Sequence, residues 1–134
     1  MRPVGSGHAR VSCAVAGCHR GTSRIENHPD WRWLNTGTND PGWLCGVHWP
    51  RVPRALKARR SAVTRLWKRR LRKARVRSFW ELPPGSPQRI AIVRTERLLA
   101  AIWARCVKIA AGEIEAADGQ LPPDMAEELR RAGL

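Results

Sequence analysis

The sequence predicts an α+β fold that is mostly α, in which a small module rich in Cys and His is followed by a basic helix and a helical hairpin. Three observations support this prediction. Residues 11–50 are rich in Gly, Asn, Asp, Pro and Trp and show no long helical period. Residues 51–80 carry apolar residues at helical spacing, and residues 81–134 contain two further helical patterns after a proline-rich break. With 134 residues, the chain is expected to form one domain, or a small domain with an appended helical part.

The N-terminal part of the chain divides into a tail and a compact module. Residues 1–10 are expected to form a loose N-terminal tail. In residues 11–50, the stretches "AVAG" and "NTGTNDPG" predict two short hairpins or knuckles, because Gly, Asn, Asp and Pro favour turns. All the clustered Cys and His residues fall in this module.

Residues 51–80 are expected to form one basic helix. Leu56, Val63, Trp67 and Leu71 recur at four- and seven-residue spacing, which places them on one apolar face. The other faces are cationic, and no Asp or Glu occurs from residue 41 to residue 80. The thirteen candidate nucleic-acid-binding residues of this segment are Arg51, Arg54, Lys57, Arg59, Arg60, Arg65, Lys68, Arg69, Arg70, Arg72, Lys73, Arg75 and Arg77.

Residues 81–134 are expected to form a helical C-terminal scaffold. The break "ELPPGSPQ" ends the basic helix, and Ser86 followed by proline provides an N-cap and first position for a helix over 87–117. A third, short helix is predicted over 123–132, because Asp124 and Glu127 have the spacing of a capping box.

The charge of the chain indicates a polyanionic partner. The net charge is +14, and residues 1–80 alone hold 18 Lys/Arg against 3 Asp/Glu. This asymmetry favours nucleic acid, DNA more than RNA, as the partner. Pairing with the acidic segment 113–128, or with a protein that has an acidic surface, is the alternative. Arg outnumbers Lys 21 to 4, which suits phosphate contacts but is equally explained by a GC-rich genome.

Four residues of the module have the spacing of a structural zinc site. Cys13, Cys18, Cys45 and His48 form a C-x4-C pair and a C-x2-H pair, and three Cys with one His is a usual tetrahedral zinc set. Zinc binding would stabilise the fold of a small module that has little hydrophobic core of its own. Cys106 lies on an apolar helix face and is expected in the core. Three other histidines are possible substitutes for one ligand: His8, His19 and His28.

The cysteine knuckle, the stretch "ENHPD" and the G-x-L-C turn before a helix together resemble the treble-clef zinc proteins of bacteriophages. Among these, residues 11–50 are most similar to the HNH nucleases of the recombination endonuclease VII type. The resemblance implies that His28 is a general base and that Asp30 lies beside it at a catalytic centre. It also implies Mg²⁺ or Mn²⁺ as a cofactor if the nuclease is active.

The match departs from the family at both ligands of that catalytic metal. Asn27 stands where the family has a metal-binding Asp, and Trp49 stands where it has a metal-binding Asn. Without the cation, His28 would lack most of the electrostatic assistance that phosphodiester cleavage needs. The sequence therefore favours a non-catalytic protein.

These observations predict a small zinc-stabilised, strongly basic nucleic-acid-binding protein of phage-like character that presents an Arg-rich helix to the phosphate backbone. The first alternative is an HNH-type metal-dependent DNA endonuclease with a rearranged site around His28. The second is a protein-interaction, inhibitor or assembly factor that uses the basic surface. Since neither a signal peptide nor a membrane span is visible, a cytoplasmic location in a bacterial or phage-infected cell is expected. The oligomeric state stays open.

Overall fold

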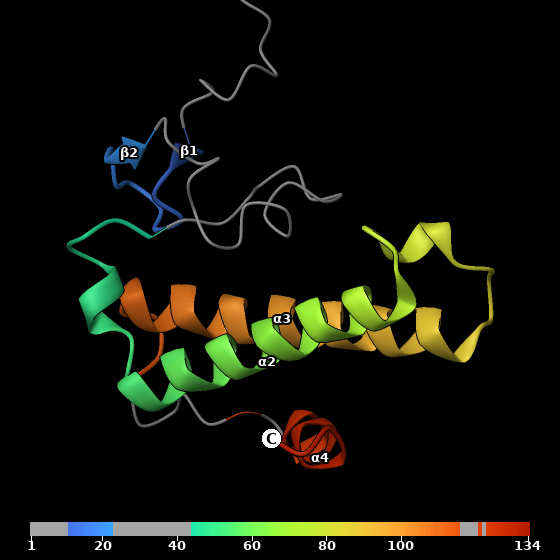
Figure 1. The fold of residues 1–134 in the computed structure, drawn as a ribbon. Helices are drawn as coiled ribbons and strands as arrows, with labels where there is room; N and C mark the ends of the chain where they lie inside the picture. Colours follow the sequence, from blue (N-terminus) through green and yellow to red (C-terminus); the bar gives the residue numbers. More distant parts are fainter. Residues whose placement is uncertain (1–10, 23–43, 116–120, 122) are drawn as a thin grey trace, which may run out of the picture.

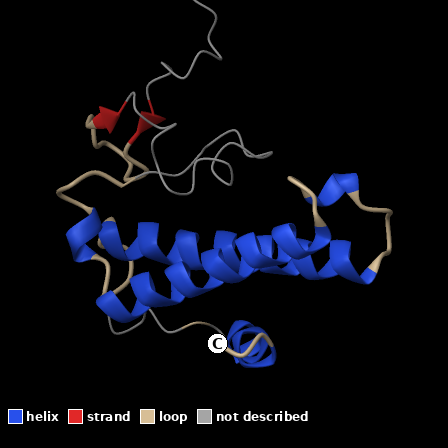
Figure 2. Ribbon diagram, viewed as in Figure 1, coloured by secondary structure: helices blue, strands red, loops and turns tan. Residues whose placement is uncertain are grey.

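A computed structural model describes residues 11–22, 44–115, 121 and 123–134. This part of the chain is mostly helical, which confirms the predicted predominance of α structure (Figure 2). The elements in chain order are β1 (Val11–Ser12), β2 (Gly21–Thr22), the 3₁₀ turn η2 (Trp49–Arg51), α2 (Arg54–Ala74), the 3₁₀ turn η3 (Phe79–Glu81), α3 (Pro87–Ala110) and α4 (Pro123–Arg131).

Helices α2 and α3 form a long hairpin that is the centre of the molecule (Figure 1). Strands β1 and β2 lie on one side of this hairpin, and α4 lies on the opposite side (Figure 1). The two strands pair antiparallel, with Val11 opposite Thr22 and Ser12 opposite Gly21. The hairpin therefore separates the Cys/His module from the C-terminal helix.

Helix α2 occupies the middle of the predicted basic segment. It begins after Pro53, whose ring fixes an extended entry to the first turn. It ends at Arg75, which adopts the left-handed conformation at φ 57° and donates its backbone N–H to the carbonyls of Arg72 and Leu71. The predicted apolar face packs against α3, and the buried residues of α2 are Leu56, Val63, Thr64, Leu66 and Trp67.

Helix α3 begins as predicted and ends before residue 117. Its N-cap is Ser86, whose hydroxyl accepts the backbone N–H of Arg89 at 3.2 Å. The helix stops at Ala110 because Gly112 takes φ 77° and closes a Schellman motif. In that motif, the backbone N–H of Gly112 donates to the carbonyl of Ile109, and the N–H of Glu113 donates to the carbonyl of Lys108. A glycine interior to the expected helix thus acts as its C-terminal stop.

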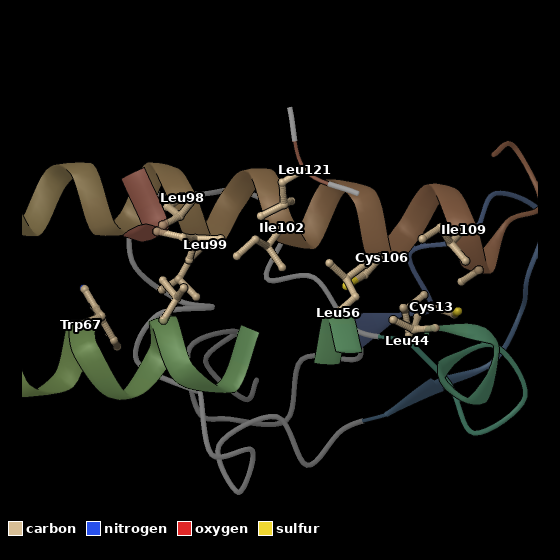
Figure 3. Packing of buried hydrophobic residues seen from close by; sticks show 14 of the residues in the cluster. Cys13, Leu44, Leu56, Trp67, Leu98, Leu99, Ile102, Cys106, Ile109 and Leu121 are labelled. Carbon is tan, nitrogen blue, oxygen red and sulfur yellow. The ribbon is translucent and has the colours of Figure 1, made fainter. Parts of the chain in front are cut away.

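One continuous core joins the hairpin to the Cys/His module. Ile92, Leu99 and Ile102 of α3 are at most 1% exposed and fill the interface with α2. The same cluster extends to Cys13 and Leu44, which lie beside the C-terminal half of α3 (Figure 3). The module is therefore packed on the hairpin.

Glu96 of α3 is a half-buried carboxylate whose charge is expected to lower stability. Burial raises the pKa of this carboxyl from 4.5 to about 7. Since the folded-state pKa is the higher one, this contribution to stability is present at low pH and is lost as the pH rises through about 7. We expect Glu96→Gln to raise the free energy of unfolding by about 1 kcal/mol at pH 8, after allowance for solvent screening.

Urea denaturation of the wild type and Glu96→Gln at pH 8 and pH 5.5 measures this effect. The difference between the two proteins should shrink at the lower pH, because the wild-type carboxyl is then protonated in the folded state. A difference that is equal at both pH values would assign the change to packing and contradict the electrostatic explanation.

Candidate metal centre

The four predicted ligands come together in one cluster. The Sγ atoms of Cys13, Cys18 and Cys45 and a ring nitrogen of His48 all lie within 4.8 Å of one another. The Sγ of Cys18 is 3.9 Å from that of Cys45, and Nδ1 of His48 is 3.4 Å from Sγ of Cys13. Around a tetrahedral zinc ion, S–S and S–N distances of about 3.5–3.8 Å are expected from bond lengths of about 2.3 and 2.0 Å. These four residues could hold a metal ion such as zinc.

Sulfur distances also exclude a disulfide as the reason for this cluster. A disulfide requires sulfurs about 2.05 Å apart, whereas Cys18 and Cys45 are 3.9 Å apart and all four cysteines of the chain are free thiols. Three thiols and an imidazole in contact are a poor hydrophobic core but a usual metal-ligand set.

Cys13 and Cys18 come from a tight knuckle between β1 and β2. The backbone N–H of Cys13 donates to the carbonyl of Arg20 at 2.8 Å. This hydrogen bond continues the pairing of β1 with β2 beyond Ser12. Gly17 adopts φ 82°, and the N–H of Cys18 closes a turn onto Val15 at 3.1 Å. A left-handed glycine lets the chain reverse within four intervening residues, so that both sulfurs point to the same place.

Cys45 and His48 come from a separate turn that precedes the helices. The N–H groups of His48 and Trp49 are both donated to the carbonyl of Cys45, at 3.1 and 2.9 Å. The basic helix is expected from residue 51, directly after this pair. Instead, the pair is followed by η2, and Pro53 delays the start of α2 until Arg54. The ligands therefore fix the entry to α2 through a short 3₁₀ turn.

The cluster favours the ionised sulfur that a metal needs. Burial acts to raise the pKa of the Cys45 thiol, but backbone N–H groups of His48 and Val47 outweigh it, and the pKa falls to about 6. Cys45 is also 1% exposed, and its own N–H is donated to Sγ of Cys13 at 3.5 Å. Such an N–H to sulfur bond stabilises negative charge on the ligand.

Aromatic and cationic contacts connect the cluster to the hairpin. Trp49, which directly follows His48, packs on Trp103 of α3 with ring centroids 6.4 Å apart. Nζ of Lys57 lies 4.6 Å from the ring centre of Trp49, and the guanidinium of Arg60 lies 5.1 Å from that of Trp103. Nη1 of Arg51 donates a hydrogen bond to the carbonyl of Ala110 at 3.1 Å. This carbonyl lies at the C-terminal end of α3, where carbonyls have no partner within the helix.

The thirteen candidate nucleic-acid-binding residues thus separate into two groups. Four of them make contacts with α3 or with Trp49: Arg51, Lys57, Arg60 and Arg70. The other nine have exposed side chains: Arg54, Arg59, Arg65, Lys68, Arg69, Arg72, Lys73, Arg75 and Arg77. Sequence periodicity alone could not make this division, because the inward cations depend on where α3 ends and where its tryptophan lies.

The candidate catalytic residues His28 and Asp30 lie outside the described residues, as does Asn27. Cys106 is fully buried in the core, as the sequence predicts, and burial raises the pKa of its thiol to about 11. Its sulfur is therefore held in the neutral form, unlike that of Cys45.

None of the helices in the described ranges combines the length and hydropathy that a membrane span requires. Comparison with known proteins gives no match to a protein-family model, to a curated protein or to a solved structure.

Proposed function

We propose that this protein binds nucleic acid through the exposed face of α2. We also propose that one structural zinc ion stabilises the Cys/His module that precedes α2, bound by Cys13, Cys18, Cys45 and His48. The observation that carries the proposal is the cationic composition of α2: ten Lys/Arg and no Asp/Glu in a 21-residue helix. A helix of this length spans about 30 Å, comparable to one turn of a nucleic-acid duplex.

The exposed cations of α2 are concentrated on the side opposite to α3. Arg54, Arg65, Arg69 and Arg72 follow one another at helical spacing on this side and are exposed, whereas Val63 on the packed side is fully buried. Such a row of guanidinium groups matches a row of backbone phosphates, which guanidinium binds in a forked geometry. It supplies affinity for nucleic acid without a preference for sequence.

The same row is unfavourable for the helix by itself. Arg65 and Arg69 are like charges four residues apart, as are Arg69 and Lys73, and such pairs destabilise a helix. Two acids of α4 are engaged elsewhere: Glu127 contacts Arg130 and Arg131, and Glu128 contacts Arg94. A polyanion along α2 would relieve the repulsion, and this supports nucleic acid over pairing of α2 with these two acids.

We expect the triple variant Arg65→Gln, Arg69→Gln, Arg72→Gln to bind a duplex DNA at least about tenfold more weakly at 50 mM salt. Fluorescence anisotropy at several salt concentrations should show that the slope of log K against log salt falls by about 3. The matched control removes three exposed cations elsewhere: Arg97→Gln, Lys108→Gln, Arg130→Gln. Equal weakening by both triple variants would contradict a binding face on α2.

A plasmid assay with Mg²⁺ or Mn²⁺ separates this proposal from the nuclease alternative. A non-catalytic protein retards the supercoiled plasmid without nicking it, and high salt abolishes the retardation. Nicking that His28→Ala removes would establish the nuclease instead. The same titration with RNA and with single strands identifies the preferred nucleic acid.

We also propose a treble-clef arrangement of phage-like type for the zinc module. A β-knuckle with two cysteines and a second pair placed shortly before a long helix support it. The 3₁₀ turn between the second pair and α2 is this chain's own variation on that arrangement.

A further inference from the structure

A second basic feature lies on the side of the hairpin away from the Cys/His module, where α4 packs (Figure 1). It is a hollow of about 200 Å³ enclosed by α2, α3 and α4. The residues that line it are Leu66, Arg70, Ala91, Arg94, Thr95, Leu98, Glu128, Arg131 and Ala132. The exposed face of α2 does not contribute to it, and the α2 residues that line it are Leu66 and Arg70, on the side toward α3.

The charges of this hollow are unbalanced in favour of an anion. Arg70, Arg94 and Arg131 contribute three positive charges, and Glu128 contributes one negative charge. Leu66 and Leu98 form an apolar wall, and a wall of low polarity strengthens the attraction between the cations and a bound anion. The formal excess of two charges matches a dianion.

Arg70 is held in place before any ligand arrives. Its Nη1 donates one hydrogen bond to the carbonyl of Ala91, at 3.0 Å, and another to the hydroxyl of Thr95. Thr95 is 2% exposed and donates its own hydroxyl to Ala91 at 2.7 Å, so its orientation is fixed. Both of these hydrogen bonds are donated by Nη1 of the guanidinium, and neither involves Nε or Nη2. A preorganised donor of this kind lowers the entropic cost of binding.

Arg94 and Arg131 also line the hollow, and both are exposed to solvent. Their side chains are 59% and 65% exposed, and each contacts one acid at a long distance: Arg94 with Glu128 at 3.8 Å, Arg131 with Glu127 at 3.6 Å. Exposed pairs of this length contribute little to stability. Both guanidinium groups can therefore turn toward an anion at small cost.

A second hollow of about 250 Å³ adjoins the first. It shares Arg94, Leu98 and Glu128 with it and adds Arg97 and Met125. The ion pair between Arg94 and Glu128 thus stands between the two hollows. The second hollow gives room for the remainder of a molecule whose charged group occupies the first.

We propose that the hollow between α2, α3 and α4 binds a phosphate group in its dianionic form, free or as the monoester end of a larger molecule. Guanidinium groups bind phosphate through paired N–H donors, and three of them line this one hollow. Neither the zinc ligands nor the exposed face of α2 takes part, so this site is independent of the proposed nucleic-acid-binding face.

Isothermal titration calorimetry with inorganic phosphate tests the site on the zinc-loaded full chain, at constant ionic strength set with NaCl. We expect saturable binding at one site per chain. Arg131→Gln should weaken it about tenfold, the usual cost of losing a hydrogen bond to a charged group. The control is Arg130→Gln, which removes the neighbouring charge of α4 and a contact to the same Glu127 but does not line the hollow. Absence of saturable binding, or equal weakening by both variants, would overturn the proposal.

A second arm of the experiment identifies the source of the phosphate. An oligonucleotide with a 5′-phosphate is compared with the same oligonucleotide ending in a 5′-hydroxyl. Tighter binding of the phosphorylated strand, abolished by Arg131→Gln but kept by Arg130→Gln, assigns the site to a nucleic-acid end. Binding of inorganic phosphate without such a preference assigns it to a free phosphate compound. The α2 triple variant should retain phosphate binding in either case, which separates a failure here from a failure of the proposed function.

Discussion

Replacement of Cys45 by Ser is expected to abolish binding of the proposed zinc ion and to lower the melting temperature by at least about 10 °C. Cys45 is 1% exposed, and its sulfur lies 3.1 Å from Nδ1 of His48 and 3.9 Å from Sγ of Cys18, so it contacts both halves of the cluster. Structural zinc contributes its binding energy directly to folding, and a loss of several kcal/mol lowers the melting temperature by about 3–5 °C per kcal/mol in a chain of this size. Metal analysis and calorimetric scanning measure the two effects.

The matched control for this prediction is Cys106→Ala. Cys106 is equally buried but lies on α3, outside the ligand cluster. This variant should keep one zinc per chain and lose only the packing of a small side chain, about 1–2 kcal/mol. Strong chelators should lower the melting temperature of the wild type and leave that of Cys45→Ser unchanged. A metal-free wild type as stable as the loaded protein would refute a structural role for the ion.

The Cys/His cluster could be predicted from the sequence because its chemistry is local. Cys13 with Cys18, and Cys45 with His48, each lie within a few residues, and short spacing largely fixes how two side chains can converge. The start of α3 was predictable for the same reason, since Ser86 and Pro87 act on the turn that they begin. Such signals do not depend on the rest of the fold.

Features that depend on distant residues could not be predicted. The sequence predicts Arg51 to be one more phosphate-binding cation. In the structure, Arg51 donates a hydrogen bond to the carbonyl of Ala110, 59 residues away. Arg70 likewise donates to Ala91 and Thr95 of α3. Both uses require the register of α2 against α3, which the apolar spacing does not specify to the residue. The hollow with three arginines is invisible in the sequence for the same reason, because its walls come from three helices.

The basic face of α2 also depends on this hairpin, which makes the core the second determinant of the proposed function. α2 carries like charges at four-residue spacing and is not expected to be stable alone. Its helical form therefore rests on burial of its apolar face against α3, around Leu56, Val63 and Trp67. Loss of that packing should release the cations from a common face even when the zinc ligands are intact.

Ile102→Ala is expected to show this dependence and to destabilise the protein by about 2–5 kcal/mol. Ile102 has no exposed surface, and it lies near Leu121 in the cluster between the helices (Figure 3). Its truncation leaves a cavity that rigid helices cannot close, and the melting temperature should fall by roughly 10–20 °C. The matched control is Ile90→Ala, the same change on the same helix at a side chain that is 46% exposed, which should cost no more than about 0.5 kcal/mol.

Zinc content and DNA affinity of the Ile102→Ala variant then separate the two determinants. At 10 °C, where the variant is still folded, it should bind one zinc and the same duplex as the wild type. On warming, its affinity for the duplex should be lost together with the helical circular dichroism, at a lower temperature than in the wild type. Retention of full DNA affinity after the helices have melted would show that the cations of α2 act as an unstructured basic segment, and that the hairpin does not serve to present them.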